Sequence, residues 1–416
     1  MRPKTFVASE HDIDHAEIDP DALYVLKKLT NAGHEAYLVG GSVRDLLLKQ
    51  HPKDFDISTS AKPKEIKDLF RKNCFLIGKR FRLAHIRFGH KVVEVSTFRS
   101  GDNDSDLIIR DNTWGCAEED ALRRDFTING LFYDPNRHTI IDYIDGWEDI
   151  HRKVLRTIGN PHIRFKQDPV RMIRLLKFRA RFGFCIDSET EQALHDCQEE
   201  IEKSSTARIL EEIFRMLESG SSAPFFHLMS QAGLLKLLLP LFAEFFEGNI
   251  GKKIYQFLEI ADQFNSKKNT KPLARPVLAS CLFFPILENE IQAHLADKEH
   301  FPHLGDVLIM SSSLIKAIVS PSFSHFPKRI STIMNSIMST QYRLTPLSGK
   351  YHYRHKLLRN KEFPLALKFL QIRAIADETV MSTYQNWSRV YRQFLQKGVP
   401  QKTHHSPPQK NETPAS

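Results

Sequence analysis

The sequence predicts an α+β head followed by an all-helical body. Strand-like and helix-like patterns alternate over residues 36–145, whereas Leu, Ile and Phe stripes at helical spacing dominate from Asp168 to about residue 396. Strand signals fade over this second stretch, which indicates a change of architecture. The 416 residues suffice for two or more domains at roughly 150 residues each.

The head is expected to consist of short elements. Residues 1–20 are polar and predict a flexible N-terminal arm, and residues 22–32 predict an amphipathic helix. The apolar run 36–39 predicts a strand that ends at two glycines, with a helix over residues 43–48 behind it. Next come a strand-like patch, a helix, a pair of strands and a turn-rich loop, over residues 55–57, 64–70, 88–98 and 100–112.

Composition excludes several classes of protein. With 41% apolar and 26% charged residues the chain is neither disordered nor fibrous. Its net charge of +9 makes an acidic partner plausible, without separating nucleic acid from a solvated basic surface. Its apolar stretches are too short to span a bilayer, so no membrane partner is expected. Five scattered cysteines and an N-terminus without a hydrophobic core predict a cytoplasmic protein with reduced thiols.

The first chemical motif is LVGGSVRD, residues 38–45. Gly40 and Gly41 stand between the expected strand and helix, where backbone amides approach a phosphate closely and the helix N-terminus favours an anion. Arg44, one turn into the helix, could pair with the same phosphate. An ordinary tight turn is the alternative. The chain contains no GxxxxGK[ST] loop of the Walker A type.

The second motif is KDFD, residues 53–56. On a strand, Asp54 and Asp56 would point to the same face and repel each other unless cations lie between them. Two Mg²⁺ ions fit such a pair, because two metals can activate an attacking hydroxyl and stabilise a leaving pyrophosphate. A solvated pair in a turn is the alternative.

The third motif is EEDALRRDFTIN, residues 118–129. Dense charge of both signs beside an apolar segment is costly to bury without a ligand. Arg124 could meet a phosphate, Asp125 a metal or a ribose, and Asn129 a ribose hydroxyl. A salt-bridged surface helix is the alternative.

The fourth motif is QDPVRMIRLLKF, residues 167–178. Asp168 and Pro169 are typical of the N-cap and first position of a helix. Arg171 and Arg174 would lie on one face of that helix near Asp168. An aspartate with two arginines offers both acceptors and donors to a nucleobase, and helix capping is the alternative role for Asp168.

In this order the four motifs resemble the class II nucleotidyltransferases, which comprise tRNA CCA-adding enzymes and bacterial poly(A) polymerases. The resemblance covers about residues 22–240. The segment LIGKRFRLAHI at residues 76–86, RDN at 110–112 and the run from residue 159 to 171 resemble bacterial poly(A) polymerases more than CCA-adding enzymes.

The resemblance implies a fold and a division of the chain. A polymerase-β-like nucleotidyltransferase head with a small mixed sheet would span residues 21–155. A helical neck with a base-selecting helix (156–220), an RNA-binding helical body and tail (221–398) and a disordered tail (399–416) would follow. The basic run at residues 350–362 could hold an RNA backbone, with a solvated helix as the alternative.

The resemblance also implies roles for individual residues. Asp54 and Asp56 would hold the two Mg²⁺ ions, and Asp125 would be the third acid, with Glu94 of VVEVSTFR as its rival. Nucleotide binding would fall to the glycine turn and its neighbours, Gly40, Gly41, Arg44, Arg124 and Asn129, with the triphosphate at the turn and at the two arginines. Base selection would fall to Asp168, Arg171 and Arg174, on a helix braced by Arg208 and Glu211. Gln167 and Lys177 depart from the usual Glu and Arg of the family, which bears on base selectivity.

The implied activity is template-independent addition of AMP from ATP to RNA 3′ ends, with release of pyrophosphate. The partners would be ATP and the 3′ ends of mRNA or other transcripts. The first alternative is a CCA-adding enzyme that uses CTP and ATP on tRNA. The second is an inactive RNA-binding protein on the same scaffold.

Overall fold

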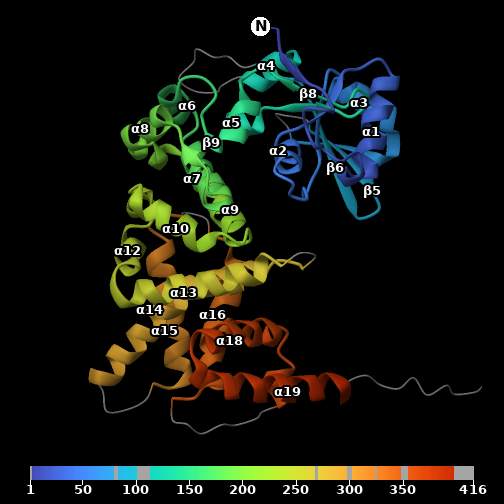
Figure 1. The fold of residues 1–416 in the computed structure, drawn as a ribbon. Helices are drawn as coiled ribbons and strands as arrows, with labels where there is room; N and C mark the ends of the chain where they lie inside the picture. The colour runs from blue at the N-terminus through green and yellow to red at the C-terminus, as the bar shows by residue number, and fades with distance from the viewer. Residues whose placement is uncertain are drawn as a thin grey trace, which may run out of the picture. The chain divides into compact units, whose positions relative to one another are not determined.

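The computed structural model describes residues 2–78, 83–100, 113–267, 270–297, 302–323, 326–347 and 355–397 (Figure 1). The chain forms two compact units, Met1–Phe246 with Pro321–His325, and Glu247–Ser320 with Phe326–Ser416. The expected disordered tail and residues 350–354 of the basic run lie outside the described residues. Among the described helices, none has the length and apolar character needed to cross a membrane.

A mixed eight-stranded sheet forms the centre of the first unit, in the order β1-β8-β7-β2-β3-β6-β5-β4. Strands β3 and β6 run parallel, and the other neighbours pair antiparallel. The strands are β1 (Lys4–Phe6), β2 (Ala36–Val39), β3 (Asp56–Thr59), β4 (Cys74–Ile77), β5 (Leu83–Phe88), β6 (Lys91–Thr97), β7 (Phe132–Asp134) and β8 (Thr139–Asp142). This sheet confirms the predicted α+β head.

The centre of the sheet positions the chemistry. Strand β2 is an almost fully buried run, and its last residue Val39 lies opposite Asp56, the first residue of β3. On the other side of β3, Asp56 is in register with Glu94 of β6. The glycine turn after β2, the DxD segment before β3 and Glu94 therefore meet at one end of the central strands.

Helices complete the first unit. They are α1 (Pro20–Asn31), α2 (Gly41–Leu47), α3 (Pro63–Phe70), α4 (Ala117–Leu122), α5 (Gly146–Arg152), α6 (Pro161–Gln167), α7 (Val170–Phe182), α8 (Ser188–Asp196), α9 (Thr206–Leu217), α10 (Ser222–Gln231), α11 (Leu234–Leu238) and α12 (Pro240–Ala243). The predicted amphipathic helix is α1, which begins as its sequence indicates, with Asp19 as N-cap and Pro20 in the first turn. Its buried face packs against β2, β3 and β6.

The expectation of a loose arm over residues 1–20 is wrong for its first part. Residues Lys4–Phe6 form β1 and pair with β8, where Lys4 lies opposite Asp142. The ring of Phe6 stacks on Trp147 at 4.2 Å between centroids. A three-residue strand carries too little alternation to be recognised, and its partner lies far along the chain.

The neck departs from the all-helical prediction at one point. Strand β10 (Cys185–Ile186) pairs in parallel with β9 (Val154–Leu155). This short ladder joins the end of the head to the segment that follows α7. Two-residue strands are below the length at which a sequence pattern is informative.

The second unit is helical in its described residues. Its helices are α13 (Gly248–Asn265), α14 (Arg275–Asp297), α15 (Leu304–Val319), α16 (Lys328–Leu344), α17 (His355–Leu358), α18 (Phe363–Ala376) and α19 (Met381–Lys397). Part of its core surrounds Trp387, which is 1% exposed and donates its indole N–H to the Leu344 carbonyl at 3.1 Å. This unit confirms the predicted helical body.

Candidate active site

A cavity of about 560 Å³ opens where the central strands meet α4, α6 and α7. Eight arginines line it, at positions 44, 99, 123, 124, 164, 171, 174 and 208, against four acids, at positions 56, 94, 125 and 168. This excess of positive charge suits a polyanion such as a nucleoside triphosphate. Of the residues predicted for the site, all line this cavity except Asp54, which lies just before β3.

The glycine turn forms one wall. Gly40 has φ +71° and ψ −129°, a conformation that side chains resist, and it caps the start of α2. A methyl group at Gly40 would lie 3.3 Å from Nη1 of Arg124, so the turn also leaves space for that guanidinium.

Protein groups use more of the hydrogen-bond donors of Arg44 than its motif predicts. It is buried, and its Nε and Nη2 donate to Oδ1 of Asp45 at 2.9 and 2.7 Å. Its Nη1 donates to Oδ1 of Asn129. Its guanidinium also lies over the rings of Phe178 and Phe182, at 5.1 and 4.7 Å. These contacts fix α2 against α7, so Arg44 lines the cavity with most of its donors already used.

The acids at the start of β3 form a cluster in which the carboxylates repel each other. Burial, followed by Glu94 and Asp54, raises the pKa of Asp56 to about 6, and Arg124 only partly opposes them. Nε2 of His85, on the neighbouring strand β5, lies 3.2 Å from Oε1 of Glu94. A divalent cation would relieve the repulsion among these three carboxylates. The described residues contain no group of three His, Cys, Asp or Glu side chains already arranged as metal ligands.

Asp125 lies in different surroundings from the other acids. Its Oδ1 accepts from the Phe126 N–H at 2.9 Å and from Nδ2 of Asn129 at 3.2 Å. Its Oδ2 pairs with Nη2 of Arg174 at 2.8 Å. Burial acts to raise its pKa, but Arg174 and these hydrogen bonds outweigh burial and lower it. Asp125 is therefore neutralised by protein groups, whereas among the described residues the acids around Asp56 raise its proton affinity more than Arg124 lowers it.

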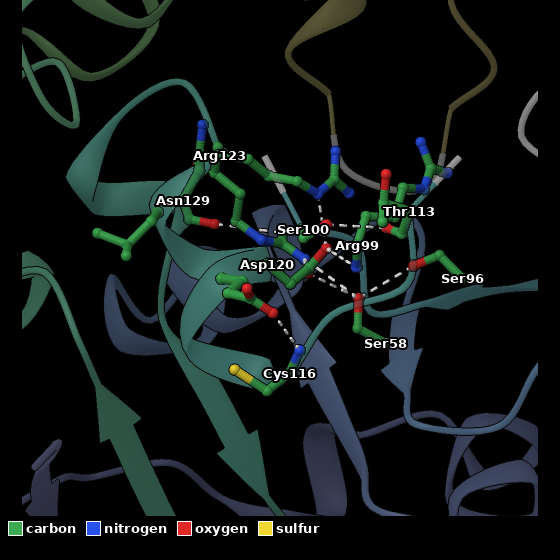
Figure 2. Close-up of polar contacts among 12 residues, drawn as sticks. Ser58, Ser96, Arg99, Ser100, Thr113, Cys116, Asp120, Arg123 and Asn129 are labelled. Atoms are coloured by element: carbon green, nitrogen blue, oxygen red, sulfur yellow. Dashed lines mark hydrogen bonds and ion pairs between the residues drawn. The ribbon is translucent and has the colours of Figure 1, made fainter. Parts of the chain in front are cut away.

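A buried aspartate that sequence reasoning left without a role organises the cationic wall. Asp120 is fully buried and accepts from Nε of Arg123 and from Nη2 of Arg124, both at 2.8 Å. Figure 2 shows the Asp120 carboxylate among Arg123, Arg99 and Ser58, and Oγ of Ser58 also contacts Ser96 at 3.0 Å. Despite burial, Arg124 and Arg123 lower the pKa of Asp120. This carboxylate holds two guanidiniums at the cavity.

The base-reading segment differs from its prediction at Asp168. Helix α7 begins at Val170 with Pro169 as its N-cap, so the capping role expected for Asp168 is wrong by one position. Its Oδ2 instead accepts from Nη2 of Arg208 at 2.8 Å. Its Oδ1 is buried and receives no hydrogen bond from the part of the chain that the structure describes. An acceptor is thus held at the cavity wall without a protein donor.

The arginines of α7 have separate partners. Nη1 of Arg171 donates to the main-chain carbonyl of Arg164 at 3.0 Å. Arg174 pairs with Asp125 and lies 3.9 Å from Glu212, which also binds Lys177. The expected brace is therefore made by Arg208 and Glu212.

Glu211, predicted as the second member of the brace, pairs with Arg215 on its own helix at 3.3 Å.

Sequence reasoning missed four residues of this site, namely Arg99, Asp120, Arg123 and Arg164. Arg123 and Asp120 lay within a motif that was singled out, but their roles depend on contacts that spacing does not reveal. Nothing in the sequence distinguishes Arg164 from the other cation of α6, Lys166, because only the structure shows that the first is buried and the second exposed.

Three family models match the chain. They describe a "Poly A polymerase head domain" over residues 36–156, a "Probable RNA and SrmB- binding site of polymerase A" over residues 183–246, and a "Polymerase A arginine-rich C-terminus" over residues 320–414.

Curated relatives agree with these models. "Poly(A) polymerase I" of Salmonella typhi is 35% identical over 397 residues, which cover 91% of this chain and 83% of the relative. "CCA-adding enzyme" of Lactobacillus helveticus is 41% identical over 197 residues, which cover 47% of this chain and 49% of the relative. A crystal structure of the Bacillus stearothermophilus CCA-adding enzyme in complex with CTP matches 90% of this chain and 83% of its own, with a TM-score of 0.62 and 24% identity. That likeness shows the same fold.

Proposed function

Because the chain belongs to the poly(A) polymerase and CCA-adding enzyme family of class II nucleotidyltransferases, we propose that it adds AMP from ATP to RNA 3′ ends without a template. Pyrophosphate is the other product. Poly(A) polymerase I of Salmonella typhi matches 91% of the chain, and the model described as a polymerase A arginine-rich C-terminus also matches. The CCA-adding relative matches only 47% of it. This difference favours AMP tailing over CCA addition.

One observation supports this chemistry above the others. A cluster of mutually repelling acids around Asp56 stands at one side of a cavity that eight arginines line. The acids suit divalent cations, and the arginines suit a triphosphate. Both are needed when an RNA hydroxyl attacks an α-phosphate and pyrophosphate leaves.

Asp54, Asp56 and Glu94 would hold Mg²⁺, two ions by analogy with the paired acids of the motif. The raised pKa of Asp56 supports this assignment, since these carboxylates repel each other in the absence of a cation. When bound, the metal would lower the pKa of the attacking hydroxyl and stabilise charge on the leaving group. Glu94 is preferred to Asp125 as the third acid, because Asp125 is already paired with Arg174.

The triphosphate would lie against Arg124, Arg123 and the glycine turn. Asp120 orients both guanidiniums, so their donors are ordered before the ligand arrives. Arg44 would act mainly by fixing α2, given its bonds to Asp45 and Asn129. The Asn129–Asp125 pair would meet the ribose hydroxyls, because it stands between the triphosphate and base-reading sides.

Asp168, Arg171 and Arg174 would select the base, with Asp168 and Arg171 at its edge. Adenine presents an amino donor at N6 and an acceptor at N1, which match the free Oδ1 of Asp168 and the N–H groups of Arg171. Cytosine presents the same pair. Guanine and uracil present a carbonyl and an N–H instead, so like groups would face each other and remain unpaired. Arg174 would hold Asp125 in place behind them.

Incorporation with each of the four nucleoside triphosphates, on an oligo(A) primer and on tRNA, tests the proposal. We expect long tails from ATP on the primer, with GTP and UTP poorly used. One to three additions restricted to tRNA would instead identify a CCA-adding enzyme. No incorporation, with RNA binding retained, would identify an inactive RNA-binding protein. Asp54→Ala should abolish incorporation and leave RNA affinity unchanged, which separates catalysis from binding.

A further inference from the structure

Arg164 of α6 makes an unusual set of contacts. It is 8% exposed, and its Nε donates to the Ile158 carbonyl at 3.0 Å. Its Nη2 donates to the carbonyls of both Leu122 and Arg124 at 2.8 Å. Three main-chain carbonyls from two separate segments thus converge on one guanidinium.

This guanidinium is buried against main-chain carbonyls, and the charge of Asp125 acts on it only from a distance. Among the described residues, no carboxylate lies within ion-pairing distance of Arg164. Burial, followed by the neighbouring charge of Arg171, lowers its pKa to about 10, so it remains cationic at neutral pH. An apolar side chain of similar volume would avoid the cost of burying a charge. Space filling therefore does not explain an arginine here.

The contacts of Arg164 connect the two halves of the cavity. Leu122 is the last residue of α4, and Arg124 follows it, so the side chain of Arg164 caps this helix end and fixes the turn that carries Arg124. The main-chain carbonyl of the same residue accepts from Nη1 of Arg171 at 3.0 Å. Arg164 is thus bonded to the triphosphate side through its side chain and to the base-reading side through its main chain.

We propose that Arg164 is a positioning residue that couples base recognition by Arg171 to triphosphate binding by Arg124. The proposal rests on the function proposed above and extends it to a residue outside the base and phosphate contacts. When Arg171 meets the correct base edge, the Arg164 link keeps the Arg124 turn in register with the α-phosphate. A wrong base displaces Arg171 and, through Arg164, the turn.

The fork of the guanidinium is required for this link. A lysine ammonium is a single point donor, so it cannot reach the Ile158 carbonyl and the Leu122–Arg124 pair together. Arg164→Lys therefore keeps the charge and loses the connection. Arg179→Lys is the matched control, because Arg179 lies on neighbouring α7, is half-buried, and pairs with Glu191 at 3.3 Å outside the cavity.

The test measures kcat and KM for ATP and for GTP on an oligo(A) primer, in wild type, Arg164→Lys and Arg179→Lys. We expect the ATP-to-GTP ratio of kcat/KM to fall about tenfold in Arg164→Lys, with a raised KM for ATP and an unchanged KM for primer. Arg179→Lys should match wild type. If Arg164 had a purely structural role, Arg164→Lys would lower the melting temperature and the active fraction, which active-site titration measures. The ATP-to-GTP ratio of kcat/KM and the KM for ATP would then stay constant, and that result would overturn the proposal.

A double-mutant cycle with Arg171→Lys supplies the second readout. Coupled residues should show losses of ATP selectivity that are clearly less than additive, whereas additive losses would contradict the link. Displacement of a fluorescent ATP analogue by ATP and by GTP repeats the comparison without turnover. If wild type extends no primer, the proposed function fails, but the ratio of ATP affinity to GTP affinity from displacement still decides the role of Arg164. A lower ratio in Arg164→Lys than in wild type supports that role, and an equal ratio overturns it.

Discussion

Replacing Asp56 with Asn should stabilise the metal-free protein at neutral pH. The pKa of Asp56 rises from 3.8 to about 6 on folding, because burial, Glu94 and Asp54 all disfavour the charged form. The folded state binds this proton more tightly than the unfolded state does. The free energy of unfolding therefore falls as the pH rises above the pKa that Asp56 has in the unfolded chain. The penalty therefore grows between about pH 4 and pH 6 and is complete above pH 7.

The size of the effect follows from the same values. A rise of about two units in the pKa corresponds to a loss of at most ~3 kcal/mol of unfolding free energy. Because the carboxylate of Asp56 is exposed to the cavity, solvent screening reduces this loss to about 1 kcal/mol. Asp56→Asn removes the ionisation, so the metal-free variant should melt a few degrees above wild type at pH 7.5. At pH 4.5 the difference should fall to about a third of its value at pH 7.5, because most of the penalty develops between the two pKa values. Asp68→Asn, at an exposed position on α3, is the control.

Differential scanning fluorimetry at both pH values, with and without Mg²⁺, measures this. Mg²⁺ should raise the melting temperature of wild type more than that of Asp56→Asn, because the variant has lost a ligand and the repulsion that the metal relieves. A variant that melts below wild type at pH 7.5 without metal, or a difference independent of pH, would refute the reasoning.

Three further substitutions address the rest of the site. Asp168→Asn should lower the ATP-to-GTP ratio of kcat/KM by about 10- to 100-fold, since it weakens the acceptor that Arg208 holds, and four-nucleotide kinetics measure this. Asp120→Asn should cost ~3 kcal/mol of unfolding free energy, because two half-buried guanidiniums lose their buried carboxylate, and chemical denaturation measures it. Gly40→Ala should cost about 1 kcal/mol through its positive φ and raise the KM for ATP by crowding Arg124, as steady-state kinetics would show.

Each of these has a clear contrary result. Unchanged base selectivity in Asp168→Asn would remove that carboxylate from base recognition. Wild-type stability in Asp120→Asn would mean that the buried charges relax at little cost. A Gly40→Ala enzyme with normal ATP affinity would show that the turn does not shape the triphosphate site.

Local motifs identified most of the site because its chemistry is carried by short segments. The turn at Gly40 and the DxD acids bring their own backbone geometry, so their place at the ends of β2 and β3 follows from pattern alone. Glu94 was recognisable as a candidate on its own strand. Our proposal that it is the third acid in place of Asp125 could not come from the sequence, because it depends on the β3–β6 register and on the pairing of Asp125 with Arg174.

What the sequence could not reveal depends on contacts between distant residues. Arg44 was expected at a phosphate, but the rings of Phe178 and Phe182 and the carboxylate of Asp45 hold it. Asp168 was predicted to read the base, with helix capping as the alternative, and the sequence did not indicate the hydrogen bond by which Arg208 holds its carboxylate. Side-chain partners across such separations are set by tertiary packing, which periodicity does not encode.

The central claim is that Asp54, Asp56 and Glu94 meet divalent cations beside a nucleoside triphosphate whose base lies at Asp168. A crystal structure of the chain with Mg²⁺ and a non-hydrolysable ATP analogue tests it most directly. We predict metal density between the oxygens of Asp54 and Asp56 and the adenine amino group at Oδ1 of Asp168. Phosphates bound away from these acids, or a metal held by Asp125 in place of Glu94, would contradict the account.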